Sequence, residues 1–251
     1  MIALLLKKKN ASVKKRTMGS FTPIWKGTKG FEGGYQQLAN DSANYCPAKG
    51  KPGSKLIGTK FGISAIAYGD YFQRCPTVEE IKNLTPELAQ KIAKTKFWDA
   101  VQGDKIKSQP VAHLVFDSVY GSGSYGPLHT RQAINKLMGA GTVQEYKSFE
   151  LSDNEVEKIN SLPDNKFFTV LSDIRKSFFK GLTYEKGYLN RMAKIVAMYS
   201  TGFFSDAEEV VKEHKGGVVI GITVIALGIG AFFLIRHLVK KKSLATKHVK
   251  K

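Results

Sequence analysis

A run of twenty residues without a charge, residues 216–235, places the strongest constraint on how this chain can fold. At 1.5 Å of rise per residue, a helix of that length spans about the 30 Å of a bilayer's hydrocarbon core. Buried helices of soluble proteins are rarely so long and so uniformly apolar. The sequence therefore predicts one transmembrane helix, over residues 216–239.

Basic residues are concentrated at the two ends of the chain. Thirteen of the eighteen net positive charges lie in residues 1–18 and 236–251, and neither stretch contains an acidic residue. An even spread of charge would have suggested nucleic acid as a ligand of the body, but the body is only mildly basic. We interpret the tails either as contacts for anionic lipid or nucleic acid, or as solvated ends.

The charges that flank the apolar run predict its orientation. Arg236 and residues 240–242 are basic and follow the run, whereas the preceding side carries three glutamates. The positive-inside rule then puts the C-terminus inside and the body outside. Residues 1–6 are too short for the apolar region of a signal peptide. We expect a single-pass membrane protein whose body faces the periplasm or the exterior of a virion membrane.

Between the two ends, the chain reads as a succession of helices. Two capping boxes, Thr77 with Glu80 and Ser152 with Glu155, each predict the start of a short helix. Pro110 opens a run that is apolar on almost every side, which is typical of a central buried helix. Helical spacing also relates Phe167, Leu171, Ile174 and Phe178. No run shows sustained alternation, so strands are expected only in a small hairpin around residues 42–58.

These patterns predict a mainly α fold with the following organisation. A basic arm occupies residues 1–18, a first helical region residues 19–130 and a second helical region residues 131–204. A stem, residues 205–215, leads to the transmembrane helix, residues 216–239, and a basic tail follows over residues 240–251.

The cysteines and histidines give little sign of metal or redox chemistry. Cys46 and Cys75 either form a disulfide, which an outside-facing body would permit, or remain two buried thiols. His113 lies in the buried helix and is interpreted as a core histidine, and His129 is isolated. No cluster of His, Cys and Asp has the spacing of a metal site, so we predict neither a metal nor a cofactor.

Three polar residues in a fixed order, Glu32, Asp41 and Thr59, carry the strongest chemical signal. Cleaving a glycosidic bond needs a protonated carboxyl to donate a proton, and a second polar group to hold water or stabilise the cation. Glu32 lies between Phe31 and Tyr35, and apolar neighbours raise the pKa of a carboxyl toward that of a general acid. The alternatives are a surface carboxylate at Glu32, a turn residue at Asp41, and a helix cap at Thr59 before a helix starting near Gly62.

Several motifs in the same region resemble the muramidases of glycoside hydrolase family 108. The resemblance runs from residues 31–35 through Asp41 and residues 59–64, and continues in residues 97–99, 116–118 and 188–191. It implies an all-α, lysozyme-like fold that cleaves the β-1,4 bond between N-acetylmuramic acid and N-acetylglucosamine in peptidoglycan. Residues 131–200 correspond to the family's small peptidoglycan-binding region. A longer insert, residues 42–58, replaces the family's glycine pair after the aspartate.

The resemblance also implies roles for individual residues. Glu32 corresponds to the proton donor, and Asp41 and Thr59 to the positions that stabilise the cation and hold the attacking water. The candidate substrate-binding residues, all within the matched motifs, are Tyr35, Phe61, Gly62 and Asp117. Arg191 is predicted to pair with a carboxylate, either of the protein or of a stem peptide.

The leading hypothesis is thus a membrane-anchored muramidase, with peptidoglycan and a lipid membrane as its partners. A phage that carries an internal membrane and must breach the wall would suit such a protein, and its tails could contact capsid proteins, anionic lipid or nucleic acid. One alternative is a lytic transglycosylase on the same fold, in which the 6-hydroxyl of the sugar replaces water. The other is a non-catalytic structural protein of a virion or envelope membrane.

Overall fold

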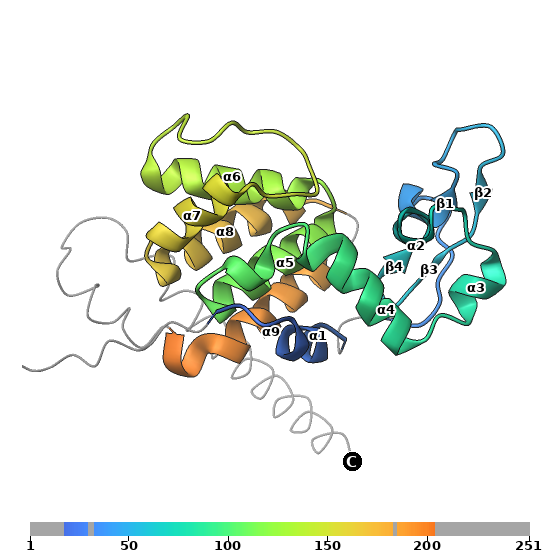
Figure 1. Ribbon diagram of the computed structural model, residues 1–251, viewed down its shortest axis with the longest axis horizontal. Helices are drawn as coiled ribbons and strands as arrows, with labels where there is room; N and C mark the ends of the chain where they lie inside the picture. The colour runs from blue at the N-terminus through green and yellow to red at the C-terminus, as the bar shows by residue number, and fades with distance from the viewer. Residues whose placement is uncertain (1–17, 30–32, 183–184, 204–251) are drawn as a thin grey trace, which may run out of the picture.

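The computed structural model describes residues 18–29, 33–182 and 185–203, which form two lobes (Figure 1). The small lobe, on the right of the view, contains the short strands and two helices. Its elements are a 3-10 turn (Ser42–Asn44), β1 (Tyr45–Cys46), β2 (Lys55–Leu56), β3 (Thr59–Lys60), β4 (Ile63–Ser64), α2 (Ala65–Phe72) and α3 (Val78–Lys82).

Helices make up the large lobe, and α4 leads to it from the small lobe (Figure 1). The helices outside the small lobe are α1 (Phe21–Lys29), α4 (Pro86–Ala93), α5 (Gln109–Ser122), α6 (Tyr125–Met138), α7 (Asp153–Ser161), α8 (Asp164–Phe179) and α9 (Glu185–Phe203). A π-helical turn (Lys94–Trp98) extends α4, and a 3-10 turn (Gly103–Lys105) precedes α5. The mainly α prediction is confirmed, and the two-lobed helical arrangement is consistent with a lysozyme-like fold.

The small lobe is built on two antiparallel hairpins. In the first hairpin Tyr45 pairs with Leu56, and in the second Thr59 pairs with Ser64. The predicted hairpin in the insert is therefore present. A disulfide joins Cys46 of β1 to Cys75, which follows α2, with 5.5 Å between the Cα atoms. Of the two alternatives left open for the cysteines, the structure has the disulfide.

Helix starts in the described residues follow local capping chemistry. Both predicted capping boxes form, Thr77 with Glu80 at α3 and Ser152 with Glu155 at α7. The cap of α2 is Ser64, whose hydroxyl accepts from the Ala67 amide at 3.2 Å. The alternative that Thr59 caps a helix near Gly62 is therefore wrong, because Thr59 lies in β3 and the helix starts at Ala65.

The core of the large lobe forms around α5, as its apolar sequence predicted. Residues 111–119 of α5 are all buried, and the helix packs against α6, α8 and α9. His113 is a core histidine, and its Nδ1 lies 2.9 Å from the Tyr199 hydroxyl. Burial lowers the pKa of His113 to about 4, so its ring is neutral at pH 7. One hydrophobic cluster extends from Phe21 to Val196 and includes both lobes.

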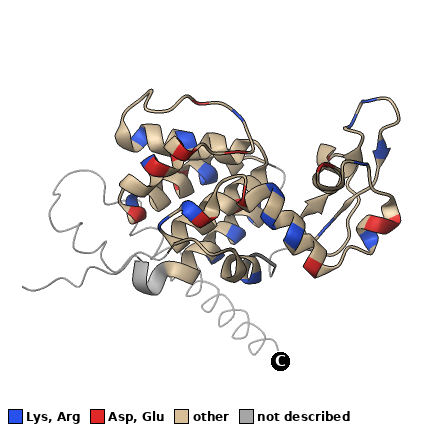
Figure 2. Ribbon diagram, viewed as in Figure 1, with Lys and Arg blue, Asp and Glu red and all other residues tan. Residues whose placement is uncertain are grey.

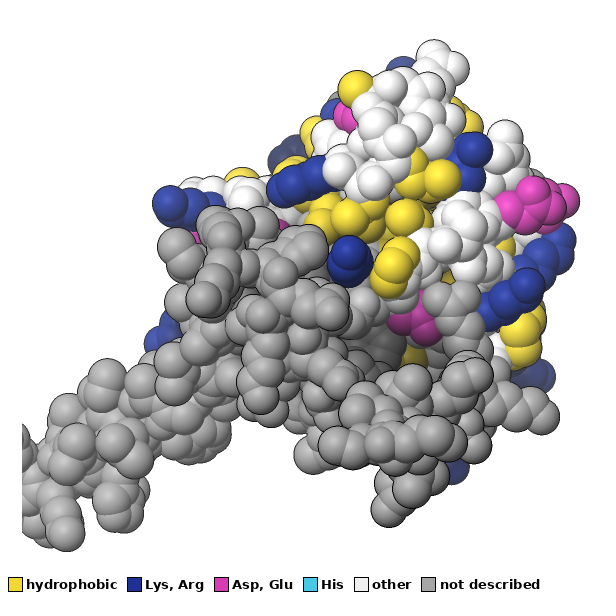
Figure 3. Space-filling view, turned by 90° about the vertical axis from the view of Figure 1, so that its left-hand side faces the viewer, with side chains coloured by type: hydrophobic (Ala, Val, Ile, Leu, Met, Phe, Trp, Pro, Cys, Tyr) yellow, Lys and Arg dark blue, Asp and Glu magenta, His cyan; other side chains and the backbone are white. Residues whose placement is uncertain are grey.

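Basic groups lie on the surface of the described body (Figure 3), in addition to those that the sequence places in the two tails. Figure 3 looks onto the side of the molecule that is on the left in Figure 1, and shows Lys and Arg side chains beside hydrophobic ones. The exposed large hydrophobic side chains are Met18, Phe72, Met138, Tyr146, Phe149, Leu182 and Met198.

Within residues 18–29, 33–182 and 185–203, no helix is both long enough and apolar enough to cross a bilayer. The predicted span, residues 216–239, lies outside the described residues, as do the stem and the basic tail. The first seventeen residues of the predicted basic arm lie outside them as well.

The disulfide generates a stability prediction for the small lobe. Replacing both Cys46 and Cys75 with serine releases a loop with a sequence separation of 29 residues. Because the unfolded chain then gains conformational entropy, the free energy of unfolding should fall by about 3 to 4 kcal/mol. Urea denaturation of the oxidised wild type and the double variant measures this loss. A difference below about 1 kcal/mol, or a further effect of reductant on the double variant, would contradict the assignment.

Candidate active site

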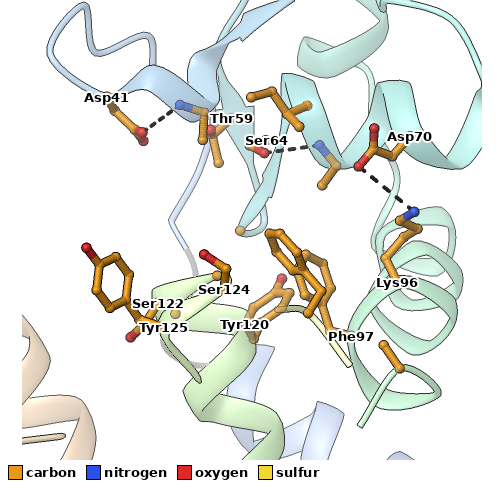
Figure 4. A pocket seen from close by; sticks show the side chains of 18 of the residues that line it. Asp41, Thr59, Ser64, Asp70, Lys96, Phe97, Tyr120, Ser122, Ser124 and Tyr125 are labelled. Atoms are coloured by element: carbon orange, nitrogen blue, oxygen red, sulfur yellow. Dashed lines mark hydrogen bonds and ion pairs between the residues drawn. The ribbon is translucent and has the colours of Figure 1, made fainter. Parts of the chain in front are cut away.

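A cleft with a volume of about 1480 Å³ lies between the two lobes. The small lobe contributes Asp41, Thr59 and Ser64 to its lining, and the end of α5 contributes Tyr120 and Ser122 (Figure 4). Its lining mixes carboxylates, hydroxyls and aromatic rings, so it offers a ligand both polar groups and apolar faces. In the described part of the chain, no group of three His, Cys, Asp or Glu residues could hold a metal ion.

Glu32 lies outside the described residues, so its place in the cleft stays a prediction. The described chain resumes at Gly33, and Gln36 lines the cleft. Gln36 forms an isolated bridge with Thr59, in which each amide donates to the other carbonyl at 2.9 and 2.8 Å. The segment that follows Glu32 is therefore fixed to the strand that carries Thr59.

Asp41 lines the cleft at the start of a 3-10 turn. One carboxylate oxygen, Oδ1, accepts a hydrogen bond from the Ala43 amide at 3.0 Å, which caps the turn. The other oxygen, Oδ2, accepts no hydrogen bond from any described residue. Asp41 thus serves both as a turn residue and as a carboxylate whose second oxygen remains available to a ligand.

Thr59 is linked to the Asp41 turn through Asn44. The Thr59 side chain is 8% exposed, and its hydroxyl donates a hydrogen bond to Asn44 Oδ1. Asn44 is fully buried; its Nδ2 donates to the Leu38 carbonyl at 3.1 Å, and its own carbonyl accepts from the amides of Ile57 and Gly58. Asn44 therefore holds the Asp41 turn and β3 together. Sequence reasoning missed it, because an asparagine in a polar turn carries no sign that it is buried.

The turn between β3 and β4 is held from the large lobe. Phe61 and Gly62 have φ angles of 51° and 74°, in the left-handed region that a residue other than glycine rarely adopts. The Tyr120 hydroxyl of α5 donates to the Phe61 carbonyl at 2.6 Å and fixes this turn. Gly62 lines the cleft, but Phe61 is not among the lining residues. The Phe61 carbonyl thus helps to hold this turn, and the predicted contact of Phe61 with substrate stays a prediction.

Tyr35 also supports the small lobe. Its hydroxyl donates to the Ile57 carbonyl at 2.7 Å, and its ring lies against Gly58, where a side chain would collide with it. Tyr35 is not among the residues that line the cleft. Tyr35 therefore makes a structural contact with the small lobe, and its predicted contact with substrate stays a prediction.

Asp117 was predicted to bind substrate, and the structure corrects this. Its side chain is completely buried in α5 and does not line the cleft. Arg175 Nη2 lies 2.9 Å from one carboxylate oxygen and Arg191 Nε lies 2.5 Å from the other. The predicted pairing of Arg191 with a carboxylate is therefore confirmed, with a carboxylate of the protein. A substrate group cannot reach Asp117, because both of its oxygens are occupied below the surface.

Three comparisons place the chain among known proteins. The family model described as glycosyl hydrolase 108 matches residues 26–123, which is less than half of the chain. No curated protein matches the chain. Among solved structures, SagA of Brucella abortus is similar, with a TM-score of 0.56 and 21% identity over 74% of this chain and 97% of that chain. At that identity the likeness to SagA supports the fold alone.

The buried ion pairs give a prediction for stability. Replacing Asp117 with asparagine leaves two guanidinium groups without a carboxylate in the core, and this should lower the free energy of unfolding by roughly 3 to 5 kcal/mol at pH 7. Asp173→Asn is the matched control, since Asp173 pairs with Lys176 at 3.4 Å near the surface. The control should lose less than about 1 kcal/mol in urea denaturation. Equal losses in the two variants would contradict the prediction.

The same carboxylate makes the wild type sensitive to acid. Burial alone would raise the pKa of Asp117, but the charges of Arg191 and Arg175 lower it to about 2. The pKa of an aspartate in an unfolded chain is near 3.9, so Asp117 stabilises the fold above about pH 4 and loses this effect as the pH falls toward 2. The free energy of unfolding of Asp117→Asn should therefore depend less on pH in that interval than that of the wild type.

Proposed function

We propose that this chain, in which residues 26–123 match the glycosyl hydrolase 108 family model, hydrolyses the β-1,4 bond between N-acetylmuramic acid and N-acetylglucosamine in peptidoglycan. The match to this family model supports a glycosidase that acts on peptidoglycan. The proposal of this bond and of water as the acceptor is supported by one observation above all. Asp41 and Thr59 both line the cleft, and Asn44 connects them through a single hydrogen-bond network.

The hydrogen bond of Thr59 suits it to orient water. Because its hydroxyl hydrogen is directed to Asn44, the lone pairs of the oxygen remain to accept a hydrogen bond from a water molecule. Such a water would be held with its own oxygen free to attack a sugar. Asp41 Oδ2, to which no described residue donates a hydrogen bond, can then take a proton from that water or stabilise the developing cation.

Glu32 completes the mechanism as the proton donor to the leaving oxygen. Its role rests on its place in the matched family segment and on the apolar neighbours Phe31 and Tyr35. A lytic transglycosylase is the alternative on the same fold. That reaction uses the sugar's own 6-hydroxyl and needs neither a water-holding threonine nor a second carboxylate, so the lining of the cleft by both Asp41 and Thr59 favours hydrolysis.

The proposed acid predicts a loss of activity without a loss of fold. Glu32→Gln cannot donate a proton, so release of soluble fragments from purified sacculi should fall at least about a hundredfold. Thermal unfolding and circular dichroism check that the variant is folded. A rate close to that of the wild type would remove Glu32 from the mechanism.

The proposed role of Thr59 is tested by a pair of substitutions. Thr59→Ser keeps the hydroxyl and should retain activity within a few fold, whereas Thr59→Val removes the water acceptor and should slow fragment release by roughly ten- to a hundredfold. Both variants change the buried contact with Asn44, so unfolding measurements accompany the rates. If valine and serine gave the same rate, the hydroxyl would have no part in the reaction.

We also propose that residues 216–239 anchor the enzyme in a membrane, with its body facing a cell wall. The apolar run and the basic residues after it support this proposal. An anchored enzyme of this kind would serve a phage that breaches the wall from an internal membrane, with its tails near lipid, capsid or nucleic acid. The full chain should fractionate with membranes after an alkaline wash, and a chain ending at residue 215 should not. Release of both by the wash would refute the anchor.

A further inference from the structure

The insert of residues 42–58 carries positive charge only. It contains Lys49, Lys51 and Lys55, all exposed, and no aspartate or glutamate. Figure 2 shows basic residues and no acidic ones along the hairpin of β1 and β2. Several other basic residues of the body form ion pairs, such as Lys82 with Glu79 and Lys105 with Asp153. Within the described chain, no carboxylate forms an ion pair with the three lysines of the hairpin.

The hairpin presents these lysines on an ordered support. The Lys51 amide donates to the Ala48 carbonyl and the Ser54 amide donates to the Lys51 carbonyl, each at 3.0 Å, so the loop consists of two closed turns. The disulfide of Cys46 fixes the base of the hairpin to the end of α2. A charged group on such a support loses less conformational entropy on binding than one on a free loop.

The base of the hairpin borders the cleft. Asp41, Ser42 and Ala43, which directly precede β1, line the cleft, and Thr59, shortly after β2, lines it as well. The lysine-bearing hairpin thus projects from the wall of the cleft that carries the proposed water-holding residues. None of the three lysines lines the cleft itself, so they could meet only a group that extends beyond it.

We propose that the hairpin of β1 and β2 binds the carboxylates of the stem peptides of peptidoglycan through Lys49, Lys51 and Lys55. This inference rests on the proposed function. A glycan strand in the cleft carries peptides on its muramic acid units, and these peptides end in carboxylates. A stem of four or five extended residues reaches about 15 Å, which is comparable to the length of a hairpin of this size. The lysines therefore select strands that still bear their peptides.

Charge-matched variants of the full chain test this proposal. The hairpin variant combines Lys49→Gln, Lys51→Gln and Lys55→Gln. The control combines Lys107→Gln, Lys158→Gln and Lys166→Gln, which change the net charge equally at positions that do not line the cleft. The substrates are sacculi stripped of wall polymers with hydrofluoric acid, and glycan strands freed of peptides by an amidase.

On sacculi at low salt, the hairpin variant should release fragments roughly three- to tenfold more slowly than the control, and the difference should vanish near about 0.5 M salt. On peptide-free strands the two variants should react at the same rate. An equal loss on both substrates, or no difference from the control on sacculi, would overturn the proposal.

Binding separates this proposal from the proposed function. Cosedimentation with sacculi does not require turnover, so the hairpin variant should bind more weakly than the control even if no fragments are released by the wild type. Absence of fragments would then count against the proposed function alone. If instead only binding to phosphatidylglycerol vesicles were lost, the hairpin would be a lipid contact and the stem-peptide proposal would be wrong.

Discussion

The buried carboxylate of Asp117 is the contact on which the large lobe depends. It joins α5 to Arg175 of α8 and Arg191 of α9, two helices that begin far along the chain. Removing three charged groups from water costs several kcal/mol for each ion, and only close pairing offsets this. The pairing joins α8 and α9 to α5 at the centre of the lobe, beside the apolar contacts among these helices.

The effect of this ion pair extends to the cleft through Tyr120. Tyr120 follows Asp117 by one helical turn, and the Arg191 guanidinium lies 5.8 Å from its ring. Its hydroxyl holds the Phe61 carbonyl of the small lobe. In that lobe Asn44 and the disulfide hold the Asp41 turn and β3 in place. The cleft is thus supported from both sides, by a buried charge in one lobe and a buried amide in the other.

Local sequence signals predicted much of the helical fold. Capping boxes at Thr77 and Ser152 depend on residues three positions apart, so they can be read directly from the chain. The α1 helix could not be read in this way, because it contains Pro23 and Gly27 and its formation depends on packing. Phe21 in α1 packs against Trp98 and Phe116, which are distant in sequence.

The sequence identified candidate site residues only where the chemistry of a side chain and a family motif pointed to the same position. Asp41, Thr59 and Gly62 line the cleft, and the roles that the motif implied for them stay predictions. Asp117 lies in an equally suggestive motif, but its side chain is buried and paired with two arginines. These partners are 58 and 74 residues away, so nothing near Asp117 in the sequence indicates the pairing. A motif shows that a chain resembles a family, but long-range pairing decides whether each residue of the motif meets the substrate or supports the fold.

The central claim of this account is that the cleft delivers water, held by Thr59 and Asp41, to a peptidoglycan sugar. Mass spectrometry of the fragments released from purified sacculi tests it most directly, since the chemical form of the new sugar end records the attacking group. The account predicts muramic acid with a free reducing end. Fragments that end in 1,6-anhydro-muramic acid would show that the sugar's own hydroxyl had attacked, and would contradict the claim.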